Sequence, residues 1–129
     1  MKLRLDNIKD YDQYGNKIHY KNSDGYEQWW KYDDYGNLIH FKNSNGHEKW
    51  YDSNGHLIHV RYSNGHEEWW DHDDHGNVIH IKWSNGDHLW YDYDDCGNRI
   101  HIKNSDGFEQ WYDSNGNKIS KEEYDRIYI

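Results

Sequence analysis

Two columns of glycine recur along the chain in a fixed rhythm, and this rhythm restricts the fold more than any other feature. A glycine of the second column always follows 10 residues after one of the first, and the step back is 11 or 9 residues. Side chains alternate between the faces of a strand, so two extra residues lengthen a hairpin without turning any side chain to the other face. The rhythm therefore predicts stacked β-hairpins. The first column comprises Gly15, Gly36, Gly55, Gly76, Gly97 and Gly116, and the second comprises Gly25, Gly46, Gly65, Gly86 and Gly107.

Each repeat contains two segments with the alternation of a half-buried strand. The first segment centres on an Ile-His dipeptide. The second carries an acid, replaced by His88 in one copy, then a Trp two residues later and another aromatic residue directly after it. Such segments, bounded by Asn, Asp, Ser and Gly, are typical of strands joined by tight turns. The Ile-His pairs are Ile18-His19, Ile39-His40, Ile58-His59, Ile79-His80 and Ile100-His101, and the Trp column is Trp29, Trp50, Trp69, Trp90 and Trp111.

The number of residues in the turn between these two segments decides which side chains share a face. With an even loop, of two or four residues, Ile18 and Tyr20 lie on the same face as Trp29, and His19 lies on the other face with Trp30. We expect the Ile and Trp29 columns to form the main core face, and the His and Trp30 columns to form a second, more polar face. An odd loop would exchange these partners.

The composition agrees with an all-β fold that has an aromatic core. The chain has no Ala, Thr or Pro, and the absence of Ala, the best helix former, argues against helices. Hydrophobic residues make up only 33%, but aromatic residues reach 18%, and Trp and Tyr each bury a large apolar area. The predicted fold class is all-β, with tandem antiparallel β-hairpin repeats that form a curved single-sheet meander or a solenoid-like array.

The acidic charge limits the classes of partner. The formal net charge is −9, from 24 acidic and 15 basic residues, which disfavours direct binding to nucleic acid or to an anionic membrane. Cys96 is the only cysteine, which fits a reducing compartment, and the first residues lack the apolar run of a signal peptide. We therefore expect a cytoplasmic protein of a bacterium or of a phage-infected bacterium.

Three segments carry a resemblance to a known family. They are Tyr11-Asp12-Gln13-Tyr14-Gly15-Asn16, Tyr32-Asp33-Asp34-Tyr35-Gly36-Asn37 and Asp92-Tyr93-Asp94-Asp95-Cys96-Gly97-Asn98. Each is similar to the Tyr-Asp-x-x-Gly-Asn core of YD repeats, also called RHS repeats. The resemblance implies a long sheet built from hairpins, which in large toxins of the family spirals into a shell around a cargo. A chain of 129 residues is too short to enclose a protein, so the resemblance implies the fold type and not the shell.

The repeats and the ends of the chain define the expected domain organisation. We predict one repeat domain over residues 1–129, with about five and a half YD-type repeats at 11–120. Residues 1–10 are expected to pair as an N-terminal capping strand, and 121–129 form a C-terminal cap. Ser120 to Glu123 resembles a helix capping box, whereas Tyr124 to Ile129 could equally form an edge strand. Because arrays of this kind leave edges and faces open, a homodimer is also expected.

No arrangement in the sequence indicates catalysis or a cofactor. Every candidate nucleophile or base recurs from repeat to repeat, whereas an active site is one arrangement in one place, so we predict no enzyme. Equivalent His residues lie two strands apart, about 9–10 Å, which is too far to share one zinc ion. His72 and His75, in an acidic turn, are weak candidates for binding a transition metal. Pairs of Asp in such turns could supply oxygen ligands for calcium, but Asp is also an ordinary turn residue, so we favour the structural role.

The leading prediction for function is a non-catalytic protein-binding module, of the inhibitor or immunity type, with a basic protein as its partner. Trp83 and Tyr62 stand where sister repeats have Asn, so they indicate an exposed aromatic patch. A carbohydrate-binding module with aromatic ladders, an acidic mimic of a polyanion that blocks a nucleic-acid enzyme, and a structural role remain alternatives. The predicted binding surface comprises Tyr62, Trp70, Trp83, Glu67, Glu68, Asp71, His59 and His80.

Overall fold

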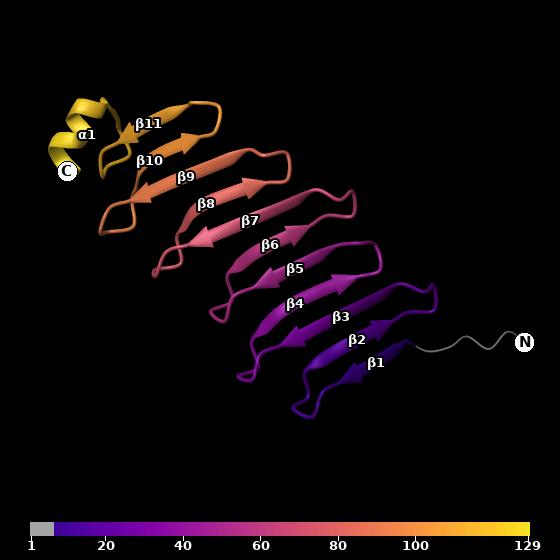
Figure 1. Cartoon of the computed structure of the whole chain (residues 1–129). Helices are drawn as coiled ribbons and strands as arrows, with labels where there is room; N and C mark the ends of the chain where they lie inside the picture. The colour runs from indigo at the N-terminus through magenta and orange to yellow at the C-terminus, as the bar shows by residue number, and fades with distance from the viewer. Residues whose placement is uncertain (1–6) are drawn as a thin grey trace, which may run out of the picture. The chain divides into compact units, whose positions relative to one another are not determined.

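Over residues 7–129, the computed structural model contains 12 β-strands and one C-terminal helix (Figure 1). It describes residues 7–129, so the first six residues of the expected N-terminal cap lie outside the described part. The chain falls into two compact units, residues 1–67 and 68–129, and each is treated separately below. The interpretation of 1–129 as one repeat domain stays a prediction.

Within each unit, every strand pairs antiparallel with the next strand along the chain. The first unit contains β1 (Ile8–Tyr11), β2 (Lys17–Lys21), β3 (Glu27–Tyr32), β4 (Leu38–Asn43), β5 (Glu48–Tyr51) and β6 (Leu57–Arg61). The second contains β7 (Glu67–His72, whose first residue belongs to the first unit), β8 (Val78–Trp83), β9 (His88–Tyr93), β10 (Arg99–Asn104), β11 (Glu109–Tyr112), β12 (Lys118–Ile119) and α1 (Lys121–Tyr128). The predicted all-β meander of hairpins is therefore confirmed.

Each hairpin turn has a three-residue loop that ends in glycine. In the turn from β2 to β3, the Asn22 N–H donates to the Tyr26 carbonyl at 3.0 Å and the Gly25 N–H donates to the Asn22 carbonyl at 3.1 Å. Gly25 has φ +86°, the left-handed conformation that closes such a loop with a bulge. The Asn22 side-chain oxygen also accepts the backbone N–H groups of Asp24 and Tyr26, both at 3.0 Å. An Asn or Asp at the first position thus stabilises the turn with its own side chain.

The odd loop overturns the expected assignment of faces. His19 lies directly opposite Trp29, and Tyr20 lies opposite Gln28, so His19 shares a face with Trp29 and not with Trp30. The same register recurs in the other repeats, as at His40 with Trp50. We call the face with the His and Trp29 columns the histidine face. The opposite face, which carries the Ile and Trp30 columns, is the apolar face.

The Ile of each Ile-His pair occupies a β-bulge. In the pairing of β9 with β10, Tyr93 lies opposite Arg99 and Asp92 lies opposite His101, which leaves Ile100 without a partner in the register. The ladder shifts at the equivalent Ile in the other repeats. A bulge increases the local twist of the strands, so the recurring Ile marks a regular bend in the meander.

The tyrosine of the Tyr-Asp motif joins neighbouring hairpins. The Tyr32 hydroxyl donates to the Lys17 carbonyl at 2.9 Å, and the Tyr93 hydroxyl donates to the Val78 carbonyl at 2.7 Å. In both copies the bond reaches back 15 residues. The aspartate that follows each tyrosine provides the side-chain acceptor of the next turn, as Asp33 does for the backbone N–H groups of Tyr35 and Asn37. Both residues of the motif therefore have structural roles.

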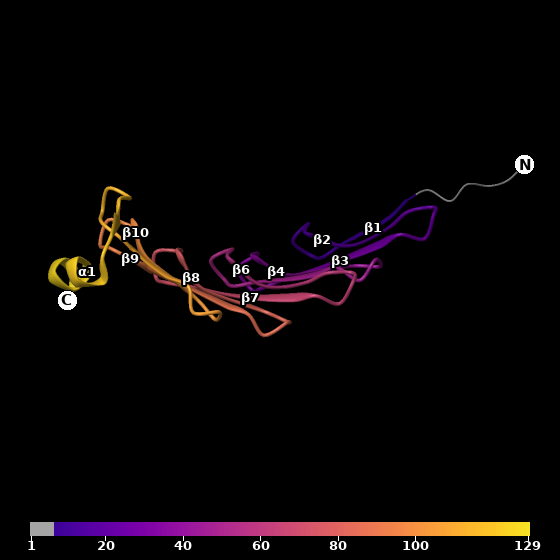
Figure 2. The ribbon, with the colours of Figure 1, turned by 90° about the horizontal axis from the view of Figure 1, so that it is seen from above.

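The sheet of each unit is one layer thick, as the view along the strand edges shows (Figure 2). Among the described residues, the only buried hydrophobic side chains are Val60, Ile81 and Ile100, with 3%, 8% and 4% of their surface exposed. All three lie on the apolar face. Most aromatic side chains of both faces remain half-buried.

The C-terminal end is a helix and not an edge strand. Ser120 caps α1, because its hydroxyl accepts the Glu123 N–H at 3.2 Å, as the capping-box pattern predicts. Tyr124 of the helix packs against the His101 ring at 5.8 Å between centroids, so α1 covers the end of the histidine face. No helix within residues 7–129 is long and apolar enough to cross a membrane.

Candidate binding surface

Two histidines of the histidine face, His19 and His101, each lie between two acidic side chains. His19 lies 2.8 Å from Asp10 through Nδ1 and 2.8 Å from Glu27 through Nε2. Hydrogen bonds to Asp10 and then to Glu27 raise the pKa of His19 above its usual 6.5. A neutral imidazole has only one N–H, so His19 donates to both carboxylates only when it is protonated. His101 has the same arrangement, with Asp92 at 2.7 Å and Glu109 at 3.4 Å.

The histidine pair of the second unit departs from this pattern. His80 Nδ1 lies 3.0 Å from Asp71, but its Nε2 lies 2.8 Å from Nδ1 of His88, which replaces the glutamate of the other repeats. One imidazole can donate and the other accept, so this hydrogen bond requires only one proton between the two nitrogens. The two rings also stack on each other and on Trp90, at 5.1–5.3 Å between centroids.

The histidine face is therefore largely committed to contacts within the chain. Each His ring stacks on or packs against a Trp ring, with centroid distances from 4.2 Å at His59 to 5.7 Å at His19. In the part of the chain from residue 7 onwards, no group of three or more His, Cys, Asp or Glu side chains could hold a metal ion. Its His and Trp rings contact each other, and its acidic side chains pair with His, so these groups already have partners within the chain.

Trp83 and Tyr62 replace the Asn or Asp that opens the other hairpin turns. The turn after Trp83 keeps the common backbone geometry, because the Trp83 N–H donates to the Asp87 carbonyl at 2.9 Å and the Gly86 N–H donates to the Trp83 carbonyl at 2.9 Å. The side chain of Asn85 accepts the Asp87 N–H at 2.9 Å. In the turn after Tyr62, Asn64 accepts the His66 N–H in the same way at 2.9 Å. These two aromatic side chains are thus not required by the turn.

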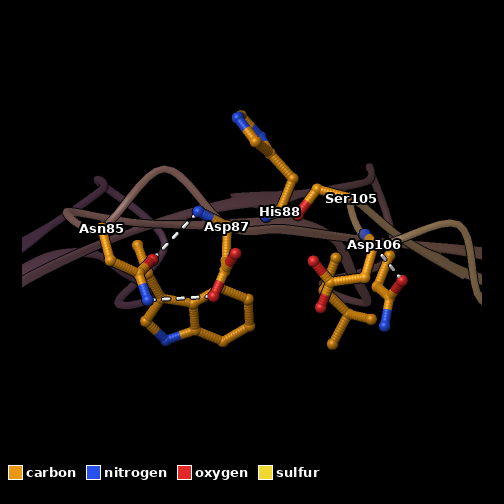
Figure 3. Close-up of a pocket in the computed structure, with 8 residues that line it drawn as sticks. Asn85, Asp87, His88, Ser105 and Asp106 are labelled. Atoms are coloured by element: carbon orange, nitrogen blue, oxygen red, sulfur yellow. Dashed lines mark hydrogen bonds between the residues drawn. The ribbon is translucent and has the colours of Figure 1, made fainter.

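A hollow of about 410 Å³ lies beside Trp83 in the second unit (Figure 3). Its walls come from the turn between β8 and β9 and from the turn between β10 and β11. Asn85, Asp87 and Asp106 lie on one side of the ribbon in Figure 3, and His88 points to the other side. The Ser105 hydroxyl accepts the His88 N–H at 2.9 Å and fixes the two turns beside each other. The lining residues are Trp83, Asn85, Asp87, His88, Leu89, Asn104, Ser105 and Asp106.

Three residues of the predicted binding surface belong to the first unit. His59 lies 3.2 Å from Glu67 on the histidine face. Tyr62 packs edge-on against His47 at 5.6 Å and stacks on His66 at 5.8 Å. The structure therefore joins His59 to Glu67 and places Tyr62 at the turn.

The other five predicted residues belong to the second unit and divide between its two faces. Asp71 and His80 form a hydrogen-bonded pair on the histidine face. Glu68 lies opposite Trp83 and accepts the indole N–H of Trp70 at 3.3 Å on the apolar face. The surface predicted as one patch thus contains groups that face opposite ways, and a binding role for any of them stays a prediction.

The residues that complete the hollow were not predicted. Asp87 stands where sister turns have Tyr26, His47, His66 and Phe108, and Asp106 follows 19 residues later in the next turn of the same kind. Alignment of the turns shows that Asp87 is unusual. The contribution of Asp106 depends on how closely two turns approach, which the sequence pattern does not give.

The acidic turns have a structural explanation. The side chain of Asp73 accepts the N–H groups of His75 and Asn77, both at 2.9 Å, and Asp94 accepts those of Cys96 and Asn98. Hydrogen bonds from the Asn98 side chain and then from its backbone N–H lower the pKa of Asp94. A metal role for His72 and His75 stays a prediction.

Comparisons with known proteins identify the architecture. No protein-family model matches the chain, and no curated protein matches it. The chain is similar to solved structures of Tc toxin chains, which contain RHS/YD repeats. One is the TcdB2-TccC3-Cdc42 structure, at 22% identity and a TM-score of 0.54, and another is the Tc holotoxin pore of Photorhabdus luminescens, at 21% and 0.52. A third is TcdB2-TccC3 without its hypervariable C-terminal region, at 21% and 0.54.

These similarities concern a small part of the toxin chains. They cover 88% of this chain but only 6–7% of each toxin chain. At this level of identity they show a shared fold alone. The class defined by fold and surface is thus a hairpin-repeat β-protein, of the architecture found within Tc toxin chains.

Proposed function

We propose that the chain is a non-catalytic module that binds a protein through its apolar face. The observation that carries this proposal is the single layer of the sheet, which leaves a continuous column of aromatic and aliphatic side chains half-exposed in each unit. Apolar area of this kind on a folded chain is typical of a contact surface. The half-buried side chains include Trp30 and Phe41 in the first unit, and Trp70, Tyr91 and Ile102 in the second.

The charge of the chain favours a basic partner. The excess of acidic residues gives a formal net charge of −9, and complementary charge accelerates encounter and disfavours wrong partners. A small acidic chain that covers a basic surface would act as an inhibitor or immunity-type protein. This role rests on the same contact surface.

We also propose that the chain belongs to the YD-repeat family. The repeated Tyr-Asp-x-x-Gly-Asn segments support this assignment. So do the hydroxyl bonds of Tyr32 and Tyr93 and the side-chain bonds of the following aspartates, which give both residues of the motif a reason to recur.

Two charge reversals in the second unit test the proposed face. Glu68→Lys changes a residue of the apolar face, and the equivalent residue of another repeat is Lys49. Asp71→Lys changes a residue of the histidine face, and the equivalent residue of another repeat is Lys31. Both substitutions change the net charge of the chain by the same amount, and at both positions another repeat already has Lys. A partner captured by the immobilised wild-type chain is expected to be lost with Glu68→Lys and kept with Asp71→Lys.

The opposite result would move the contact to the histidine face. Capture that is unchanged by both reversals, together with specific binding on a glycan array, would instead favour a carbohydrate-binding module. A complex that both reversals weaken equally, and that salt disrupts steeply, would favour the mimicry of a polyanion.

A further inference from the structure

The hollow beside Trp83 combines an aromatic side chain with acceptors and lacks a cation. Its lining includes the indole of Trp83, the carboxylates of Asp87 and Asp106, and no Lys or Arg. His88 belongs to the lining, but its ring points to the other side of the ribbon and bonds to His80 (Figure 3). The groups that face the hollow thus favour a ligand that donates hydrogen bonds.

The two carboxylates differ in how they are held. Asn85 donates from its side-chain amide to Asp87 at 2.9 Å, and this bond fixes the orientation of that carboxylate. In the described part of the chain, the Asp106 side chain has no hydrogen bond or ion pair, although its backbone N–H donates to Asn104 at 3.0 Å. One carboxylate is therefore positioned, and the other is available.

We infer that this hollow binds an arginine side chain of the partner protein. A guanidinium is planar and stacks on an indole, and it carries five N–H donors and no acceptor, which matches a hollow lined by the Trp83 indole and by two carboxylates. The inference deepens the proposed function, on which the choice of a protein ligand rests. Trp83 and the two aspartates lie on the side of the sheet that carries the apolar face.

Other ligands match the hollow less well. An ammonium is more strongly hydrated and does not stack as a plane. Sugar hydroxyl groups both donate and accept, and a site for them needs protein donors as well as acceptors. Here the side-chain amide of Asn85 donates to Asp87, and the side-chain oxygen of Asn104 accepts the N–H groups of Asp106 and Phe108. The Trp83 indole, the Asn104 amide and the Ser105 hydroxyl are neutral donors, so they do not balance the charge of the two carboxylates. Two carboxylates without a Lys or Arg in the lining favour a cationic ligand over a neutral sugar.

A titration with short peptides tests the inference without any partner. The full chain, labelled with ¹⁵N, is titrated with the acetylated and amidated peptide Gly-Arg-Gly, and the Trp83 indole and the Asp87 and Leu89 backbone resonances are followed. Saturable shifts at these three residues are expected. The same peptide with citrulline in place of arginine, which is neutral and of the same shape, is expected to bind at least about fivefold more weakly.

Variants that copy sister repeats serve as controls for folding. Trp83→Asn restores the residue found at Asn22, Asn43 and Asn104, and Asp106→Asn restores the residue found at Asn45 and Asn85. Each is expected to weaken the arginine peptide at least about fivefold. The matched change Asp24→Asn, at the equivalent turn position of the first unit, is expected to leave the affinity unchanged.

Several results would overturn the inference. Equal affinity for the arginine and citrulline peptides would show that the positive charge is not recognised. Shifts confined to residues away from Trp83, Asp87 and Leu89 would show that the peptide does not bind in the hollow. Shifts of the Trp83 indole with methyl glycosides, and none with the arginine peptide, would assign the hollow to sugars. Since no partner is used, this test can fail while the Glu68→Lys test succeeds, so the two proposals fail separately.

Discussion

The turn at residues 22–26 of the first unit and the turn at 83–87 of the second have one backbone geometry and two different first residues. The closing N–H to carbonyl distances are 3.0 and 2.9 Å, and the glycines have φ values of +86° and +94°. Asn22 stabilises its turn with two side-chain hydrogen bonds, whereas Trp83 contributes an indole to a hollow. A serine hydroxyl joins each turn to the next one of its kind, through Ser44 and Ser105. The comparison shows that the turn keeps its backbone geometry without the Asn side chain. A side chain at this position can therefore contribute to a binding site instead.

The largest expected effect tests whether the buried side chains of the apolar face, and not the turns, dominate stability. Ile100 and Ile58 are sister bulge residues, but 4% of Ile100 is exposed against 37% of Ile58. Ile100→Ala is expected to reduce the free energy of unfolding by about 2–4 kcal/mol, because a large aliphatic side chain leaves the interior. Ile58→Ala is expected to cost less than about 1.5 kcal/mol. Urea unfolding measures both, and equal losses would contradict the role of burial.

The next effect addresses the compared turns directly. Asn22→Ala removes the acceptor of two backbone N–H groups and is expected to cost about 1–2 kcal/mol. Trp83→Asn is expected to change the stability in the opposite direction, with a gain of about 0.5–1 kcal/mol, because it restores the side chain that suits the turn. The same urea experiment reports both signs. A loss of stability in Trp83→Asn would mean that the indole is a structural element of its turn.

A smaller effect tests how the two carboxylates act on His19. His19 lies between two carboxylates, and its pKa in the folded chain is raised above 6.5. The contribution of His19 to stability is therefore complete below about pH 6.5 and is lost as the pH rises through the raised pKa. An NMR titration of the His19 ring is expected to give a midpoint above 6.5, which falls in Glu27→Gln. Glu68→Gln, on the other unit and the other face, is the matched control. A midpoint unchanged by Glu27→Gln would remove the carboxylate as the cause.

The smallest expected effect is weak binding of the arginine peptide at a copy of the hollow introduced into the first unit. Asn22→Trp, Asp24→Asn, Tyr26→Asp and Asn45→Asp together copy the residues of the second unit at positions 83, 85, 87 and 106. The variant is expected to bind the arginine peptide at both turns, with new shifts at residues 22–28. A folded variant with shifts only near Trp83 would show that Leu89 or the local approach of the turns is also needed.

The sequence predicts the architecture because its period, its glycines and its turn residues all indicate hairpins. It does not predict the faces, since Asn45-Gly46 is compatible with a loop of two residues as well as with a loop of three that begins after Asn43. The structure has the loop of three, and the side chain of Asn43 stabilises it by accepting the N–H groups of Asn45 and His47. The unusual residue Trp83 is visible in the sequence. The hollow is not, because Asp106 joins it only through the Ser105 contact between two turns.

A loop closed mainly by its own backbone and by one glycine accepts many residues at its other positions. Asn, Asp, Tyr and Trp all begin such loops in this chain, and the hydrogen-bonded frame is the same in each. Loops that lack Asn or Asp at the first position, such as the one after Trp83, can therefore be varied with little risk to folding, much as antibodies vary their hypervariable loops on a constant sandwich. A display library randomised at residues 83, 85, 87 and 106 would turn this small sheet into a source of new binders.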